Sequence, residues 1–275
     1  MNIENQAELY DTGEWHLTVY FSCRRGMAFL RNIAEPTAPV RMLLDATWNA
    51  EGTALLREIE KAVYEHPAIL DDYSADIIVA TPDTLWVPAA LCDDEDALES
   101  CYTSVRPDAN PADIMTETDD DVAALTTGTP GLRSFLARTF PGARVQSRAM
   151  VMLRRFRNYP GGGKRVYLHI EDSEAVITAF DHRRLIASAT HPAPSTADAC
   201  YALLLTMEAF ALPADTTEVF VSGEAGIRRE ITEILRRHIN YVMHTVLPSG
   251  ADSGAIPLCA LLASRKEGNG NHFKS

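Results

Sequence analysis

Two short polar segments carry residue types that could hold an anion. Arg24, Arg25 and Gly26 stand together in a turn, so two cations and an unhindered backbone could meet a phosphate or a carboxylate there. Gly223 and Gly226 follow a short apolar run and indicate a strand-to-helix turn. Glycines at such a turn would also let a ligand approach the backbone, and the sequence leaves both interpretations open.

Familiar motifs for phosphate or nucleophile chemistry are absent. Segment 161–164 reads Gly-Gly-Gly-Lys, but Asn158 and Arg165 stand where a phosphate-binding loop requires glycine and then serine or threonine. No Gly-x-Gly-x-x-Gly motif follows an expected strand, and no Gly-x-Ser-x-Gly motif is present. We therefore assign no catalytic residue from the sequence.

The histidines and cysteines do not indicate a metal site, because no pair has metal-ligand spacing. His16, His169 and His182 fall in or beside expected strands, and we expect them to be packed or surface residues. The five cysteines are scattered and odd in number, which is typical of a reducing cytosol. The chain has no signal-peptide pattern and no apolar run long enough to span a membrane, so we expect a cytoplasmic protein.

Charge is distributed unevenly along the chain. Residues 1–150 contain 11 Lys and Arg against 25 Asp and Glu, whereas residues 151–275 contain 14 against 13. Nucleic-acid binding requires a dominant basic surface and is therefore not expected. We expect the acidic runs 93–96 and 119–121 to be solvated. A basic cluster could dock an acidic partner, but pairing with the acidic half is favoured; its members are Arg148, Arg154, Arg155, Arg157, Lys164 and Arg165.

The same series of elements is predicted twice along the chain. In the first half, apolar alternation and proline breaks predict strands at 15–21, 27–33 and 40–47, a helix ending before Pro67, and a strand at 76–80. In the second half the same patterns predict strands at 165–170, 175–180 and 184–190, a helix capped by Ser195 and stopped by Pro213, and a strand at 218–221.

This order predicts an α/β fold made by internal duplication of a β-β-β-α-β unit, with lobes at 1–148 and 149–275. Segment 160–163 is the best candidate hinge between the lobes. Further elements are expected outside the repeated unit: helices at 94–105, 131–139 and 227–238, and strands at 121–125, 241–246 and 257–263.

A duplicated three-stranded meander followed by a helix and a strand resembles the actin-like ATPase (ribonuclease H-like) fold of sugar kinases, Hsp70-type chaperones and actin-like filament proteins. The chain as a whole is similar to an uncharacterised bacterial family catalogued as domain of unknown function 3822. The similarity covers nearly the full length and is strongest between Arg165 and Gly226, in the runs YLHI, AVITAF, ACYALLLTMEAFALP and EVFVSG.

The resemblance implies a phosphate loop at the first turn of each half and an adenosine loop near Gly223 and Gly226. Segment 22–26 lacks the aspartate of that pattern, although Arg24, Arg25 and Gly26 could still meet an anion. Segment 171–174 (Glu-Asp-Ser-Glu) lacks glycine and places three unpaired acids where a polyphosphate would lie. Like charges in a shared site repel, so this pattern favours a lost site.

Two functions of different classes remain open. The first is a degenerate actin-like scaffold, without catalysis or cofactor, that binds an unidentified protein partner. The second is an ATP-binding protein, ATPase or kinase with atypical loops, in which Gly223, Gly226, Arg24, Arg25 and Gly26 would contact the nucleotide. A homodimer is a further expectation, because the apolar strand at 175–180 could pair at a sheet edge.

Overall fold

The computed structural model describes residues 12–35, 37–159, 162–246 and 255–263. Its first sheet is an antiparallel meander extended by two parallel strands, in the order β3-β2-β1-β4-β8. The strands of this sheet are β1 (Trp15–Phe21), β2 (Arg25–Asn32), β3 (Arg41–Thr47), β4 (Ser74–Val79) and β8 (Arg144–Ser147).

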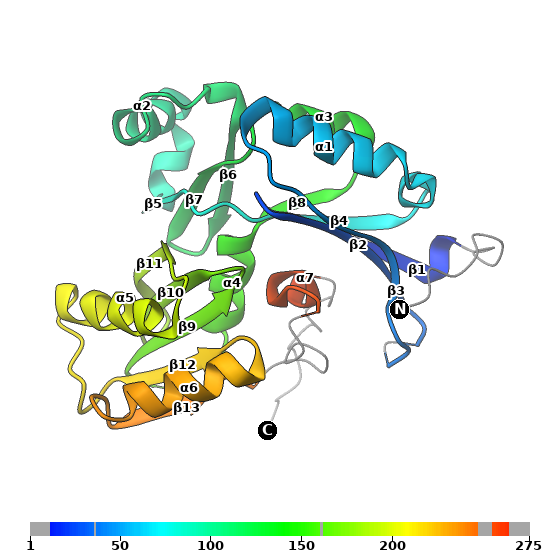
Figure 1. The fold of residues 1–275 in the computed structure, drawn as a ribbon. Helices are drawn as coiled ribbons and strands as arrows, with labels where there is room; N and C mark the ends of the chain where they lie inside the picture. Colours follow the sequence, from blue (N-terminus) through cyan, green and yellow to red (C-terminus); the bar gives the residue numbers. More distant parts are fainter. Residues whose placement is uncertain (1–11, 36, 160–161, 247–254, 264–275) are drawn as a thin grey trace, which may run out of the picture.

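The second sheet repeats this arrangement, in the order β11-β10-β9-β12-β13. Its first three strands are again antiparallel neighbours, and its last two run parallel to β9. The strands are β9 (Lys164–Glu171), β10 (Glu174–Asp181), β11 (Arg184–Pro192), β12 (Glu218–Ser222) and β13 (Tyr241–His244). The molecule is therefore a two-lobed α/β structure with equivalent sheets (Figure 1).

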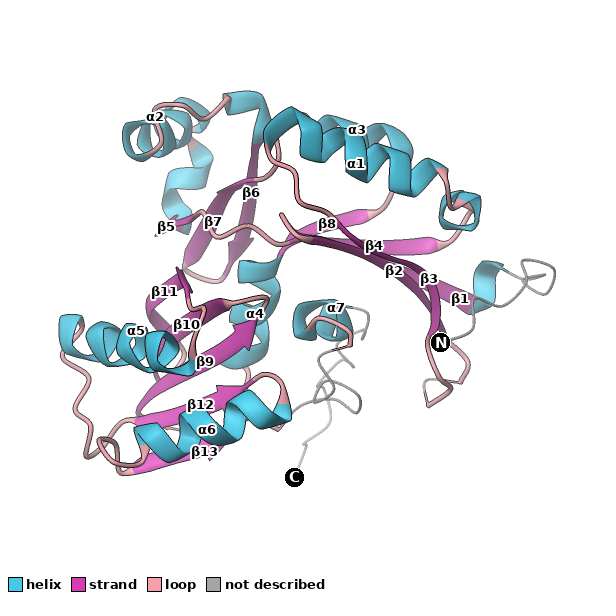
Figure 2. Ribbon diagram, in the orientation of Figure 1, coloured by secondary structure: helices cyan, strands magenta, loops and turns pink. Residues whose placement is uncertain are grey.

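Helices cover the outer face of each sheet (Figure 2). On the first sheet they are α1 (Gly52–Tyr64) and α3 (Leu132–Thr139), and on the second they are α5 (Thr196–Ala209) and α6 (Ala225–Leu235). The expected cap of α5 is confirmed, because the Ser195 hydroxyl accepts from the Asp198 amide in a capping box. The α1 helix ends before Pro67, as its pattern predicts.

A small antiparallel sheet interrupts the first lobe between β4 and α3. Its strands lie in the order β5-β7-β6, and α2 (Glu95–Val105) packs against it. The strands are β5 (Thr84–Pro88), β6 (Ile114–Asp119) and β7 (Val122–Thr127). Once this insertion is set aside, α3, β8 and α4 (Arg148–Arg157) of the first lobe correspond in order to α6, β13 and α7 (Leu258–Ala263) of the second. The repeated series is thus three elements longer than the sequence predicts.

The last helix of each series packs on the other lobe. α4, which follows β8 of the first sheet, contacts β10 and β11 of the second, whereas α7, which follows β13, contacts β1 and β4 of the first. The two helices also contact each other between the sheets. The lobe boundary expected after residue 148 stays a prediction, and this exchange means that each lobe depends on a helix from the other series.

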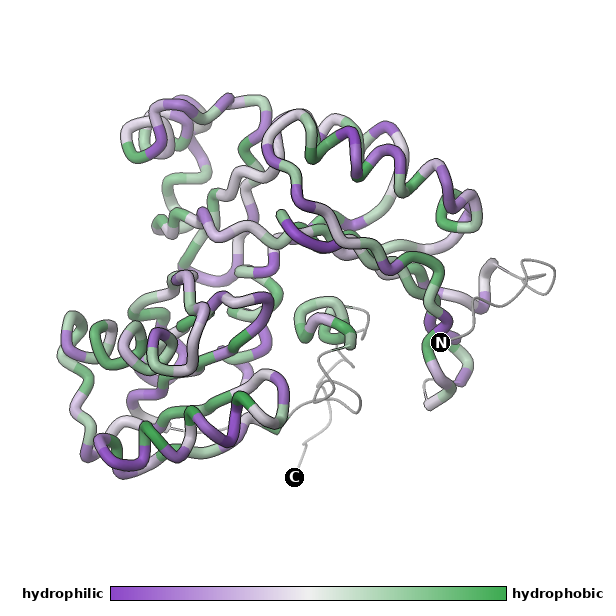
Figure 3. Tube along the Cα trace, viewed as in Figure 1, coloured by the Kyte–Doolittle hydropathy of each residue, from purple (hydrophilic) through white to green (hydrophobic). Residues whose placement is uncertain are grey.

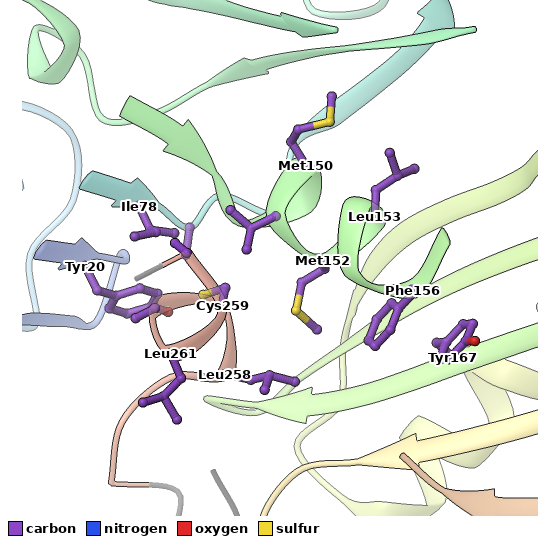
Figure 4. Packing of buried hydrophobic residues seen from close by; sticks show 14 of the residues in the cluster. Tyr20, Ile78, Met150, Met152, Leu153, Phe156, Tyr167, Leu258, Cys259 and Leu261 are labelled. Carbon is purple, nitrogen blue, oxygen red and sulfur yellow. The ribbon is translucent and has the colours of Figure 1, made fainter. Parts of the chain in front are cut away.

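The core between the sheets is apolar and closely packed (Figure 4). From the first sheet, Tyr20 and Ile78 face α7, and from the second, Tyr167 stacks on Phe156 of α4 with ring centroids 4.2 Å apart. α7 is apolar around its whole circumference (Figure 3), and Leu258 and its neighbours along the helix are buried. A helix apolar on every face requires burial on every face, which this position between the sheets provides.

Two sequence expectations are wrong. Residues 257–263 were expected as a strand, but 258–263 form α7, because a short, wholly apolar run has no periodicity that separates a buried helix from a buried strand. The strand at 175–180 lies within β10, between β9 and β11, so it offers no free edge for a homodimer. The sequence also left β5, β6, β8 and α4 unassigned. Pro160 and Gly161 of the expected hinge lie outside the described residues.

The two glycines in the turn from β12 into α6 have different structural roles. Gly223 has φ +134°, and a Cβ atom there would lie 2.7 Å from the carbonyl oxygen of Ile170. Gly226 lies in the first turn of α6, where an added Cβ would approach no atom closer than 3.6 Å. The backbone conformation and the close approach both require glycine at position 223 only.

Gly223→Ala is therefore expected to lower the free energy of unfolding by about 1–3 kcal/mol, because it adds backbone strain and a clash. Gly226→Ala is the matched control and should leave stability unchanged or slightly raised, since alanine is the better helix former. Urea unfolding followed by circular dichroism measures both. Equal losses in the two variants would contradict this assignment.

Leu261→Ala in α7 should cost about 2–5 kcal/mol of unfolding free energy, as expected for a truncated core leucine. Leu205→Ala in α5 is the matched control, because Leu205 is also helical but 48% exposed, and surface substitutions usually stay within about 0.5 kcal/mol. The same unfolding measurement applies. A cost at position 261 as small as that at 205 would show that α7 does not hold the core together.

Candidate functional site

The first turns of the two lobes line one shared cleft. The β1–β2 turn contributes Ser22, Cys23 and Arg24, and the β9–β10 turn contributes Asp172 and Ser173. The rest of the wall is formed by the ends of β4 and β11, by Glu174 of β10 and by Arg148 of α4. The cavity has a volume of about 130 Å³. The turns meet because β1 and β9 hold equivalent central positions in the two sheets.

The first turn satisfies its own backbone amides. The Ser22 hydroxyl accepts from the amides of Arg24 and Arg25 at 3.2 and 3.0 Å, and the Ser22 amide donates to the Arg25 carbonyl at 2.8 Å. A phosphate-binding turn must present free amides to the anion. The amides of Arg24 and Arg25 are instead bonded within the turn.

The three residues expected to meet an anion at this turn have different surroundings. Arg24 is exposed and lines the cleft. Arg25 points to Asp45, to which it donates two hydrogen bonds of 3.0 Å. Gly26 packs against Trp48, whose ring would lie 2.1 Å from an added Cβ atom. Packing alone thus accounts for this glycine, and the three residues' contact with a nucleotide stays a prediction.

The second turn is a tight hairpin connection without glycine. Asp172 and Ser173 both have positive φ, at +50° and +62°, as a two-residue type I′ turn requires. The Ser173 carbonyl accepts from the Ala193 amide at 2.7 Å, which ties the turn to the end of β11. The turn therefore presents side chains rather than a glycine backbone to the cleft.

Arg148 neutralises part of the acidic turn, contrary to the expectation of three unpaired acids. It begins α4, its side chain is 2% exposed, and its guanidinium lies 2.5 Å from Glu174 and 3.9 Å from Glu171. Burial alone would lower the pKa of Arg148, but Tyr20, Glu174 and Glu171 raise it overall. The buried guanidinium stays charged and holds two carboxylates.

Glu171 also holds the N-terminus of α7. Its carboxylate accepts from the Leu258 amide at 3.2 Å and lies 3.7 Å from the ring of His169. Burial raises the pKa of Glu171, but the neighbouring His169, Arg148 and the Leu258 amide lower it overall. A carboxylate at a helix N-terminus is favourable, because the unbonded amides there carry partial positive charge.

Asp172 is only partly compensated by the neighbouring arginines. Its pKa is raised, first by burial and then by repulsion from Glu171, although Arg25 and Arg148 act against the rise. The acidic turn is thus one repelled carboxyl beside two that are paired. The sequence missed Arg148 in this role because neither β8 nor the start of α4 was assigned, so its position near the turn was hidden.

The other sequence candidates make structural contacts. Arg157 is buried and forms ion pairs with Asp119, Asp120 and Asp121 at 3.0–3.2 Å. The acidic run at 119–121 therefore surrounds a buried arginine and is not simply solvated. Arg165 donates to the carbonyls of Tyr159 and His182, and Lys164 to that of Ala211. Pairing with the acidic half, the favoured interpretation, accounts for Arg154 and Arg157.

The histidines resolve into packed and surface residues. His169 is buried and hydrogen-bonds Ser222 at 3.0 Å, and His16 contacts Ser74 and Asp76. His182 lies at the surface beside Asp181. Within the described part of the chain, no three His, Cys, Asp or Glu side chains are grouped as a metal site would require. None of the described helices is both long and apolar enough to cross a membrane.

Solved structures share this fold at low sequence identity. A Bacteroides thetaiotaomicron protein with actin-like ATPase fold and unknown function is 15% identical, with a TM-score of 0.74 over 95% of this chain and 100% of that one. A chain of the PilM–PilN type IV pilus biogenesis complex is 12% identical, with a TM-score of 0.51 over 88% of this chain and 91% of that one. No curated protein matches the sequence significantly.

These similarities give the chain the actin-like ATPase fold, as the duplicated meander predicts. A family model matches residues 41–242, which is well over half of the sequence and includes both turns of the second lobe's meander. The chain therefore belongs to the family described as protein of unknown function (DUF3822).

Proposed function

We propose that this chain is a non-catalytic, protein-binding scaffold built on the actin-like ATPase fold. The observation that carries the proposal is the charge arrangement of the cleft between the two first turns. Glu174 and Glu171 form ion pairs with the Arg148 guanidinium. The Glu171 carboxylate also accepts a hydrogen bond from the Leu258 amide at the N-terminus of α7. Groups that could bind the phosphates of a nucleotide are thus bound to the protein's own carboxylates.

Two further features support the proposal. The cavity of about 130 Å³ is well below the roughly 300–1,000 Å³ of typical ligand pockets. The amides of Arg24 and Arg25 in the first turn already donate to the Ser22 hydroxyl. A triphosphate that bound these amides would therefore break one hydrogen bond within the protein for each hydrogen bond that it formed. The residues present therefore do not fit a nucleoside triphosphate, and we derive no hydrolytic step.

A protein partner is the other half of the proposal. The PilM–PilN structure shows that a chain of this fold can belong to a protein complex, and we extend that use to this chain as a hypothesis about its role. All five cysteines are free thiols, which supports a reducing, cytoplasmic setting. Internal duplication of an ancestral unit is part of the same proposal, supported by the two equivalent strand orders.

ATP binding is the competing function, and Arg24 is the observation that favours it. This exposed cation lines the cleft, and a nucleotide that avoided the acidic turn could contact it. Gly223 no longer adds support, because Ile170 accounts for its lack of a side chain.

The first test is thermal unfolding with ATP or ADP, with and without Mg²⁺. A ligand at 100 times its Kd stabilises by about 2.7 kcal/mol, which is several degrees of Tm for a protein of this size. We expect no shift, and we expect a protein to co-purify with the chain from its native cell. A Mg-ATP shift that Arg24→Ala abolishes would overturn the scaffold and support nucleotide binding.

The second test concerns the sign of the charge at Asp172. Because the pKa of Asp172 is raised, its ionisation costs stability at neutral pH. Asp172→Asn should raise Tm slightly at pH 7, since asparagine tolerates φ +50°. The gain should shrink as pH falls through the raised pKa and vanish below the unfolded value of about 3.9, where both states bind the proton.

Asp120→Asn is the matched control. Asp120 also has φ +50° at a hairpin turn, but it forms an ion pair with Arg157 at 3.1 Å. Its replacement should give no stabilisation at pH 7. If Asp172→Asn lowered Tm at pH 7, the carboxylate would be a stabilising group and the picture of a crowded acidic turn would be wrong.

A further inference from the structure

A second cavity lies between the edges of two sheets, away from the cleft. It measures about 390 Å³ and is lined by β6 of the small sheet, by Val145 of β8, and by α3 with the segment after it. β6 ends the order β5-β7-β6, and β8 ends the order β3-β2-β1-β4-β8. Each strand therefore has one side without a neighbouring strand in its own sheet, and both line this cavity.

The backbone of β6 is only partly satisfied along this side. Arg133 donates to the Ile114 carbonyl at 2.7 Å, and Arg154 donates to the Thr118 carbonyl at 3.0 Å, so these carbonyls point away from β7. Backbone groups of a strand alternate in direction with a period of two residues. Those of Thr116 therefore point the same way, and no hydrogen bond from a described residue outside the ladder reaches them.

The backbone of β8 has a matching position. The Ser147 amide points away from β4 and donates to the Glu117 carboxylate at 2.7 Å. By the same alternation, Val145 turns its backbone groups to this side, and within the described chain they form no hydrogen bond beyond the sheet. Thr116 and Val145 thus present open backbone positions to one cavity, which Glu117 closes at one end.

The remaining walls suit a particular side-chain chemistry. Met115, Leu136 and Phe140 line the cavity with apolar surface. Arg133 also lines the cavity. Its described hydrogen bonds go to neutral backbone carbonyls, so no carboxylate among the described residues balances its charge. Arg144, at the start of β8, is paired with Asp76 at 2.7 Å, so Arg133 is the cation of this wall. The wall therefore favours an apolar side chain inside and a carboxylate at the arginine end.

We propose that this groove, defined by Thr116, Val145, Leu136, Phe140 and Arg133, binds an extended peptide segment of a partner protein by β-strand addition. The peptide pairs its backbone with the open positions of β6 or β8, inserts an apolar side chain, and places an acidic residue near Arg133. The inference rests on the proposed scaffold function and gives that function a location.

The test uses the whole chain and a displayed library of random peptides of about 10 residues, longer than the 5–6 residues of a typical strand. A selected peptide is synthesised and its Kd is measured by fluorescence anisotropy. Ala137→Arg, on the exposed face of α3 at the cavity, should weaken binding at least tenfold. Ala54→Arg, also exposed but on α1, is the matched control and should leave Kd unchanged.

The peptide itself supplies the second arm. Methylating alternate backbone nitrogens should abolish binding, because those amides would pair with the strand edge, and changing the acidic residue to lysine should weaken it. Failure to select any peptide, or selected peptides that bind Ala137→Arg as tightly as the parent chain, would overturn the groove assignment. Those outcomes contradict the groove but not the scaffold proposal. Stabilisation of the chain by ATP would contradict the scaffold proposal and would leave the measured peptide Kd unchanged.

Discussion

The exchange of α4 and α7 between the lobes is the interaction on which the rest of the structure depends. Each helix leaves the sheet that precedes it and packs on the other, and the two meet in the core between the sheets. Apolar burial of this kind is the largest favourable contribution to folding. It also fixes the cleft, because α4 begins with Arg148 and α7 begins with the amide that Glu171 holds. The positions of the two first turns follow from that core.

A buried arginine places a strict electrostatic demand on its surroundings. Removing a charge from water costs several kcal/mol, which only a close counter-charge with good geometry offsets. In this fold Glu174 and Glu171 provide that charge for Arg148, and the 119–121 run provides it for Arg157. Glu171 and Glu174 of the acidic turn, and the 119–121 run, are therefore paired with internal arginines. The backbone framework around the cleft is that of the actin-like fold.

The elements with a clear period or a clear stop could be predicted from the sequence. In the strands of the two meanders, apolar residues alternate with polar ones or form short runs. The α1 helix ends shortly before Pro67, and Ser195 caps α5. α7 could not be predicted, because burial on all sides removes the periodicity that identifies a helix, and β8 is only four residues long. At the cleft, Arg24 could be placed from its turn. The pairing of Arg148 with Glu174 could not, since it depends on how β8 leads into α4, and the need for glycine at position 26 depends on Trp48.

The position of α7 has a consequence for how the chain matures during synthesis. The inner surface of β1 and β4 is exposed as soon as the first sheet forms, yet the helix that covers it follows β13 in chain order. A ribosome must therefore deliver the whole second lobe before that surface is sealed. Until then an apolar face carrying residues such as Tyr20 and Ile78 stays open to solvent, and nascent chains in that state are prone to aggregate. Final assembly is thus a late event, after translation has passed both sheets.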